Sequence, residues 1–172
     1  MGSQFIRGAL AAALLLTFAP AGGCSYGLKD GYFVKGDVRY RIAAPPGGWK
    51  RLKLADNDVA YVSNDAHHSV AVNATCEDHA DPPLDVLTQH MLLGFTDREA
   101  QASEKVVLDG REGLRSRYVA RLDGVPVELD MVVMKKDGCV YDFVYLSPVG
   151  KADAQRAFFD SVLRQFAAER RA

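Results

Sequence analysis

The stretch that decides the fold is VPVELDMVVMKKDGCVYDFVYLS (125–147), in which two β-branched and aromatic runs flank the Asp-Gly dipeptide at 137–138. An Asp-Gly dipeptide between alternating apolar residues is a strong hairpin signal. The preceding run, GLRSRYVARL (113–122), enters this stretch through a second Asp-Gly dipeptide at 123–124. Two-residue turns fix the register of the strands they join. We therefore expect three strands in an antiparallel meander.

This register sorts the side chains of the meander onto two faces, of which one is mostly apolar and is expected to form the core. That face carries Leu114, Ser116, Tyr118, Ala120, Leu122, Val125, Val127, Leu129, Met131, Val133, Val140, Asp142, Val144 and Leu146. The opposite face grades from arginines, past Glu128 and Asp130, to the aromatic residues of 141–145. Only the aromatic side of that second face is expected to need a cover.

Length and charge indicate one ordinary globular domain, because 172 residues with 48% hydrophobic content and a net charge of -1 suffice for a single core. No cluster of lysine and arginine outweighs its acidic neighbours, so nucleic acid is not an expected partner. The one long apolar run is at the N-terminus and is short for a membrane span.

Residues 1–23 are predicted to be a signal peptide, because Arg7 precedes the apolar block GALAAALLLTFAP (8–20) and small residues lead to Cys24. The segment AGGC (21–24) resembles the lipobox of bacterial lipoproteins, although Ala21 stands where that motif usually has leucine. The resemblance implies lipidation of Cys24 and attachment to the membrane through the N-terminal lipid. Cleavage after Ala21 by ordinary signal peptidase is the alternative, and it would release a soluble protein.

Residues 24–31 are then expected to be the tether, and 32–170 the single domain. Ser25 follows the cysteine where aspartate often signals inner-membrane retention, so the outer membrane is the favoured location.

Lipidation of one of the three cysteines would leave Cys76 and Cys139, which both lie near predicted strand ends. An exported protein passes through an oxidising compartment, where a pair of thiols can form a disulfide. The pattern allows that bridge, and it also allows two buried free thiols.

The remaining elements are predicted from periodicity and turn signals. Strands are expected near 32–42, in two parts of 58–76 around a loop at 64–66, and at 101–108; helices are expected within 81–94, with Asp81 and Gly94 as caps, and within 152–171. Trp49 follows a Pro-Pro-Gly-Gly strand stop and is expected to be an aromatic plug at one end of the core. Two helices and about seven antiparallel strands give an α+β sandwich.

The order of these elements resembles the PsbP/DcrB-like family. The resemblance rests on APPGGW (44–49), on the hairpin that runs into the first helix, on FVYLSP (143–148) and on FFDSVLRQF (158–166), and it covers about 33–168. It implies an antiparallel sheet between helical layers, an α/β/α sandwich. The family includes an extrinsic subunit of photosystem II, periplasmic lipoproteins and a nuclear-transport factor, so it implies an accessory or protein-binding role. It supplies no ion-binding or partner-binding residues for this chain.

The sequence contains no recognisable catalytic motif, so we predict no catalytic residue, no cofactor and no metal site. His67 and His68 could chelate together only in a loop, with His79 and Asp81 as distant candidates, and we expect surface loop histidines instead. His90 is expected at the boundary of the core.

Asp142 is the candidate functional carboxylate, because the turn at 137–138 places it on the apolar face opposite Val133. A buried carboxylate needs a hydrogen-bonding partner or a raised pKa, and either can mark a functional site. The alternative is a structural role near the end of the sheet, with a bond to a loop amide or a tyrosine hydroxyl.

Arg115, Arg117 and Arg121 form a predicted exposed row that could meet phospholipid head groups or an acidic partner. The register sets Arg117 directly across from Asp130, with Glu128 diagonal to it. Cross-strand charge pairs of this kind explain the row without a ligand.

The sequence thus favours an exported, lipid-anchored, non-enzymatic protein that binds an unidentified protein of the cell envelope. A second hypothesis is a carrier or sensor of a small apolar ligand, in a cavity lined by Tyr141, Phe143, Tyr145 and Phe158. A third is an unrecognised hydrolase with polar groups near Asp142 or His67.

Overall fold

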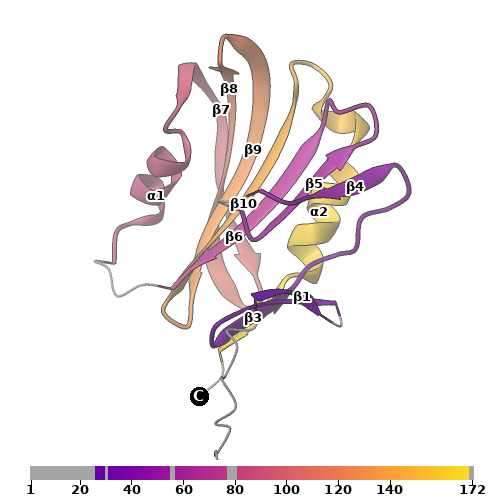
Figure 1. The fold of residues 1–172 in the computed structure, drawn as a ribbon. Helices are drawn as coiled ribbons and strands as arrows, with labels where there is room; N and C mark the ends of the chain where they lie inside the picture. The colour runs from indigo at the N-terminus through magenta and orange to yellow at the C-terminus, as the bar shows by residue number, and fades with distance from the viewer. Residues whose placement is uncertain (1–25, 30, 55–56, 77–80, 171–172) are drawn as a thin grey trace, which may run out of the picture.

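The computed structural model of the chain describes residues 26–29, 31–54, 57–76 and 81–170 (Figure 1). The predicted signal peptide, Cys24 and His79 lie outside the described residues. The predictions made for them stay predictions.

The centre of the molecule is a seven-stranded antiparallel sheet in the order β4-β5-β6-β10-β9-β8-β7 (Figure 1). Its strands are β4 (Trp49–Leu52), β5 (Val59–Ser63), β6 (Ser69–Thr75), β7 (Phe95–Leu108), β8 (Arg111–Leu122), β9 (Val125–Lys136) and β10 (Cys139–Pro148). The α+β class and the approximate number of strands are confirmed.

The meander of β8, β9 and β10 has the predicted register. Leu114 and Asp142 are the partners of Val133 on its two sides. Both Asp-Gly turns have positive φ at both positions, 49° and 79° at 123–124 and 53° and 75° at 137–138. That is the type I′ geometry, whose twist matches the flanking strands. The sequence therefore determines the register locally, through its turns.

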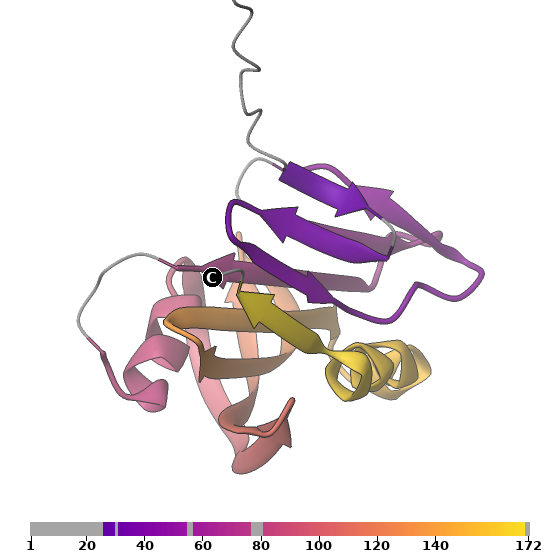
Figure 2. The same cartoon turned by 90° about the horizontal axis from the view of Figure 1, so that it is seen from below.

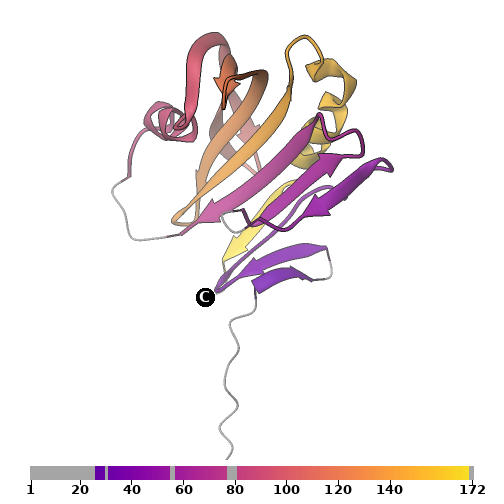
Figure 3. The same cartoon turned by 45° about the horizontal axis from the view of Figure 1, so that its top comes forward.

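A second, four-stranded sheet lies across one end of the molecule (Figures 2 and 3). Its order is β1 (Tyr26–Lys29), β2 (Tyr32–Lys35), β3 (Val38–Arg41) and β11 (Ala167–Arg170). A separate second sheet was not predicted from the sequence. Within 24–31, which was predicted to be a tether, Tyr26–Lys29 form β1 and pair with β2.

Two helices lie on opposite faces of the large sheet. Helix α1 (Leu84–Met91) lies over β8 and β9, and the single-turn η1 (Ala152–Ala154) leads into α2 (Arg156–Gln165) on the other face. The predicted Asp81 cap is wrong, because α1 starts after Pro83 with no side-chain cap. The last helix is shorter than predicted, since the chain straightens after Phe166 into β11, which pairs with β3.

Both faces of the meander are buried, and the larger core lies on the face opposite to the predicted one. The predicted face forms a small core under α1, with Leu92, Ala120, Leu129 and Met131 fully enclosed. The larger core joins the aromatic side of β10 to α2 and the small sheet, and it includes Phe33, Tyr40, Tyr141, Phe143, Tyr145, Phe159 and Phe166. Trp49 packs on Phe158 with ring centroids 4.8 Å apart, as expected of an aromatic plug.

Candidate functional site

Asp130 of β9 is the centre of a buried ion network between the large sheet and α2. Its side chain is 3% exposed and accepts hydrogen bonds from Arg115 Nε at 2.8 Å and Arg115 Nη2 at 2.7 Å. Arg156 Nη1, from the first turn of α2, also binds Asp130. A buried carboxylate requires compensation of this kind, because desolvation of an unpaired charge is costly.

The network continues outward through two more carboxylates. Arg115 Nη2 contacts Asp160 of α2 at 2.9 Å, and Arg156 Nε contacts Asp153 of η1 at 3.1 Å. The hydrogen bonds that Arg115 donates to Asp130 raise the pKa of Arg115 above its ordinary value. The five charged groups thereby fix α2 and η1 against β8 and β9.

Arg117 is left out of this network, which corrects the predicted pairing. The register does place Arg117 opposite Asp130. Asp130 nevertheless binds Arg115 and Arg156, and within the described residues Arg117 has no ion pair. The predicted exposed row is also wrong for Arg115, whose side chain is only 18% exposed. Arg117 itself is exposed, and it lines a pocket.

This pocket, of about 180 Å³, lies where α2 and η1 stop covering the large sheet. It is lined by Gln101, Arg117, Tyr118, Glu128, Leu129, Asp130, Tyr145, Ser147, Ala152 and Arg156. We call it the sheet-end pocket. Gln101 belongs to an irregularity of β7, where the register with β8 shifts between Ala100 and Ala102. Such bulges redirect a side chain and are frequent beside functional sites.

One wall of the sheet-end pocket is a buried polar cluster around Tyr145. Its hydroxyl donates to the Ala152 carbonyl at 2.7 Å and lies 2.9 Å from His68 Nδ1. The single proton of that hydroxyl is used in the bond to Ala152, so His68 Nδ1 carries a proton and donates it to the Tyr145 oxygen. Burial raises the pKa of Tyr145 to about 12. His68 is 5% exposed, so the prediction of a surface loop histidine is wrong for it, whereas His67 is exposed.

Two further polar groups of this pocket are incompletely satisfied. Ser147 is 1% exposed, and its Oγ lies near Tyr145 but completes no hydrogen bond within the described part of the chain. Glu128 accepts the backbone N–H of Gly150 at 2.9 Å and is in no ion pair among the described residues. Among the described residues, the pocket therefore presents the guanidinium of Arg117 and the carboxylate of Glu128 without an ion pair, and the Ser147 hydroxyl without a completed hydrogen bond.

Asp142, the predicted functional carboxylate, lies on the opposite face of the sheet from this pocket. It lines a groove of about 280 Å³ under α1, together with Thr75, Leu87, His90, Met91 and Val140. Burial raises the pKa of Asp142 to about 6. Its carboxylate makes no hydrogen bond to any described residue, so the suggested loop amide or tyrosine partner is not found there. His90 is exposed and shares this groove.

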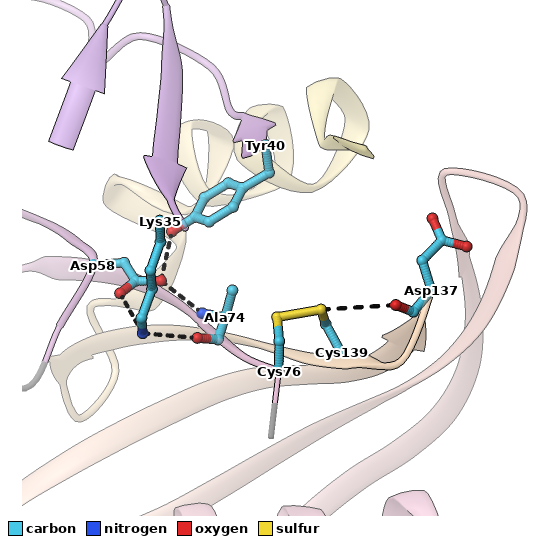
Figure 4. The surroundings of a disulfide bond; sticks show 7 residues. All are labelled: Lys35, Tyr40, Asp58, Ala74, Cys76, Asp137 and Cys139. Atoms are coloured by element: carbon cyan, nitrogen blue, oxygen red, sulfur yellow. Dashed lines mark hydrogen bonds and ion pairs between the residues drawn. A yellow bond between two sulfur atoms is a disulfide. The ribbon is translucent and has the colours of Figure 1, made fainter. Parts of the chain in front are cut away.

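Cys76 and Cys139 form a disulfide, which confirms one of the two alternatives left by the sequence (Figure 4). It joins the end of β6 to the start of β10, with Cα atoms 4.2 Å apart. An ion pair between the buried Asp58 and the half-exposed Lys35 lies beside it, in which Asp58 accepts from Lys35 Nζ at 3.1 Å and from the N–H of Ala74 at 2.8 Å (Figure 4). This end of the sheet is therefore held both covalently and electrostatically.

The aromatic residues predicted to line an apolar ligand cavity are packed against other rings. Tyr141 and Phe143 both contact Phe166, with centroids 5.0 and 4.9 Å apart, and Tyr145 stacks on Phe159 at 5.7 Å. Phe158 is covered by Trp49. Their packing gives the apolar carrier hypothesis no support.

The described ranges contain no group of three or more histidine, cysteine or acidic side chains that could hold a metal ion. Nor does any helix of those ranges have the length and apolar character needed to cross a bilayer.

The fold is similar to known structures, although no protein-family model and no curated protein matches the sequence. The cyanobacterial PsbP (CyanoP) of Synechocystis sp. PCC 6803 is 17% identical, with a TM-score of 0.56 over 88% of this chain and 100% of that chain. LpqN of Mycobacterium tuberculosis, which is involved in cell envelope biogenesis, is 11% identical, with a TM-score of 0.55 over 75% of this chain and 83% of that chain. A protein of Bacteroides thetaiotaomicron is 10% identical, with a TM-score of 0.53 over 78% of this chain and 46% of that chain. The chain thus has the PsbP-like fold that its sequence resemblance implied.

Sequence reasoning missed three residues of the sheet-end pocket. Ser147 carried a usable signal, because alternation along β10 places it on the same face as Tyr145. No sequence signal placed Gln101 or Arg156 in the pocket. A bulge has no reliable local signature, and the contact between Arg156 and Asp130 joins residues that lie 26 positions apart.

Proposed function

We propose that this protein is an exported, non-catalytic accessory protein of the cell envelope that works by binding another protein. The observation that carries the proposal is one end of the large sheet, where exposed apolar side chains lie at the strand ends beyond the pocket that Arg117 lines. The cores of protein–protein interfaces are rich in apolar residues and arginine, and they contain few lysine, glutamate or aspartate side chains.

The apolar side chains of this surface come from three turns at one end of the large sheet. Val125 is 60% exposed where β9 begins, and Val149 is 46% exposed just after β10. Leu93, between α1 and β7, is 72% exposed. The hydrogen bond from Gly150 to Glu128 holds the turn after β10 against β9. We call Leu93, Val125, Val149 and Arg117 the sheet-end surface.

Export is supported by the disulfide and by the leader. Disulfides persist in oxidising compartments and are rare in the cytosol of mesophiles. The Cys76–Cys139 bridge therefore agrees with the apolar block at 8–20 and with the small residues before Cys24. The similarity in fold to LpqN, a protein involved in cell envelope biogenesis, supports the same location.

The position of the first described strand supports an orientation for the anchored protein. β1 lies at the lower end of the molecule, whereas the β8–β9 turn and the turn after β10 lie at the upper end (Figures 1 and 3). A chain tethered just before β1 would direct the sheet-end surface away from the membrane. In the proposed mechanism, the lipid on Cys24 supplies the location and this surface supplies the recognition.

The test is site-specific photo-crosslinking in cells that express the full chain. A photoreactive residue replaces Val125 or Val149 in the sheet-end surface, and Leu54, which is 50% exposed beyond β4, provides the matched control position. We expect the same discrete protein adduct from both valine positions and none from Leu54. Equal labelling from all three positions, or no adduct at the valines, would refute the proposed surface.

A further inference from the structure

We propose that the sheet-end pocket binds a small zwitterionic ligand of the α-amino acid type, with its carboxylate on Arg117 and its ammonium on Glu128. The inference goes beyond partner binding, because it concerns the interior of the pocket and not the exposed apolar side chains at the neighbouring strand ends.

The two unpaired charges of the pocket are arranged as a complementary pair. Arg117 of β8 and Glu128 of β9 are diagonal neighbours on the same face of the sheet, since Arg117 pairs with Asp130 and Glu128 with Val119. Both line the pocket, and they form no ion pair with each other. A ligand that carries both charges can satisfy the two groups at once.

The other charged groups of the pocket do not compete for such a ligand. Asp130 is saturated by Arg115 and Arg156, and Arg156 also contacts Asp153. The network therefore acts as a rigid wall whose charges are already compensated. Arg117 and Glu128 therefore determine which ligand binds. The planar guanidinium of Arg117 favours a carboxylate, because it can donate two parallel hydrogen bonds to it.

Neutral polar groups complete the site. The Ser147 hydroxyl is buried and completes no hydrogen bond with a described residue, a costly arrangement that a ligand oxygen would relieve. Gln101 is brought to the pocket by the bulge of β7, and its amide can donate to a carboxylate or accept from an ammonium.

The size of the pocket limits the ligand to a few heavy atoms. Its volume of about 180 Å³ is smaller than the roughly 300–1,000 Å³ that is typical of pockets for drug-sized ligands. A free amino acid with a small side chain fits this limit.

The test uses the ¹⁵N-labelled mature protein, titrated separately with glycine, L-serine, acetate and ethylammonium. We expect saturable NMR shifts of the Gln101 side-chain amide and the Ser147 backbone amide with glycine and L-serine. Acetate and ethylammonium each satisfy one of the two charges and should bind more weakly. The absence of saturable shifts with both glycine and L-serine would overturn the proposal.

Two charge-removing variants assign the roles. Arg117→Gln should weaken binding of L-serine and of acetate by about tenfold or more, because it removes a charge-assisted hydrogen bond. Glu128→Gln should weaken binding of L-serine and leave acetate unchanged. Arg111→Gln, at the far end of β8, is the charge-matched control and should change neither. Arg117 is exposed and has no ion pair among the described residues, so Arg117→Gln should fold normally. If this variant bound L-serine as tightly as wild type, that result would also overturn the proposal.

This outcome is distinguishable from that of the partner-binding proposal. Crosslinking from Val149 is read in cells as a protein adduct, whereas ligand binding is read on the purified protein. Either result can therefore fail while the other succeeds.

Discussion

Arg117 lies directly across from Asp130 in the pairing of β8 and β9, yet the two side chains form no ion pair. Asp130 is instead bound by Arg115, a diagonal neighbour, and by Arg156 of α2. A buried carboxylate gains most from cations that are themselves shielded from water, and both partners are about one-fifth exposed. The consequence is an unpaired arginine in a pocket of an otherwise compensated network.

Removal of the charge at the centre of this network should destabilise the protein strongly. Asp130→Asn leaves Arg115 and Arg156 largely buried without their shared carboxylate, and breaking a buried pair costs about 3–5 kcal/mol. Urea denaturation at neutral pH measures the change in the free energy of unfolding. Arg117→Gln is the matched control and should stay within about 0.5 kcal/mol of wild type, because its target is an exposed, unpaired side chain. Equal effects of the two variants would contradict the assignment.

The Cys76–Cys139 bridge should contribute a large part of the stability. It closes a loop with a sequence separation of 63, for which the chain-entropy model gives about 4 kcal/mol. We expect the double variant Cys76→Ala/Cys139→Ala, and the wild type under reductant, to lose a similar amount in chemical denaturation. Intact mass spectrometry provides the control: without reductant, neither cysteine should react with an alkylating agent. Alkylation of both would mean that the bridge is absent.

Asp142 should make stability fall as pH rises from about 4 to about 6. Its pKa is about 6 in the fold against 3.8 for an unperturbed aspartate, so the native state binds more protons than the unfolded state in this range. The carboxylate is thus most unfavourable above pH 6, where it is charged. Each pKa unit corresponds to about 1.4 kcal/mol, so Asp142→Asn should gain at most about 3 kcal/mol at pH 7.5.

The same substitution should change little near pH 3.5, where Asp142 is already protonated in the fold. The measurement is the difference between wild type and Asp142→Asn in urea denaturation across pH 3.5–7.5. This difference removes the contributions of titrating groups that lie far from Asp142. A difference that is independent of pH would contradict the raised pKa. Loss of a biological activity in Asp142→Asn without loss of stability would assign the groove a function of its own.

The meander could be predicted from sequence because its information is local. Each Asp-Gly turn adopts the one geometry that suits it, and alternation then assigns every side chain to a face. This was enough to place Asp142 opposite Val133 and Arg117 opposite Asp130. It was not enough to identify the larger core, because that depends on which elements cover each face. The sequence pattern predicts helix for the four residues after Phe166. They form β11 instead, because the open edge of β3 is available for pairing there.

The sheet-end pocket was harder to predict, because residues far apart in the chain build it. Gln101, Glu128 and Arg156 come from a bulge, a central strand and a helix. Each one alone looks like an ordinary solvated side chain. Only the fold shows that Asp130 is already saturated by other arginines, and therefore that Arg117 is available to a ligand or a partner.

The proposed function depends on export and on attachment of the chain through Cys24, and the mature N-terminus tests both directly. We expect intact mass spectrometry of the protein extracted from membranes to show a chain that begins at Cys24 and carries acyl groups. Cys24→Ala should move the protein out of the detergent phase in a phase-partition assay. A mature chain that begins at Gly22 with a free thiol, or equal partitioning of wild type and Cys24→Ala, would contradict the anchored envelope protein proposed above.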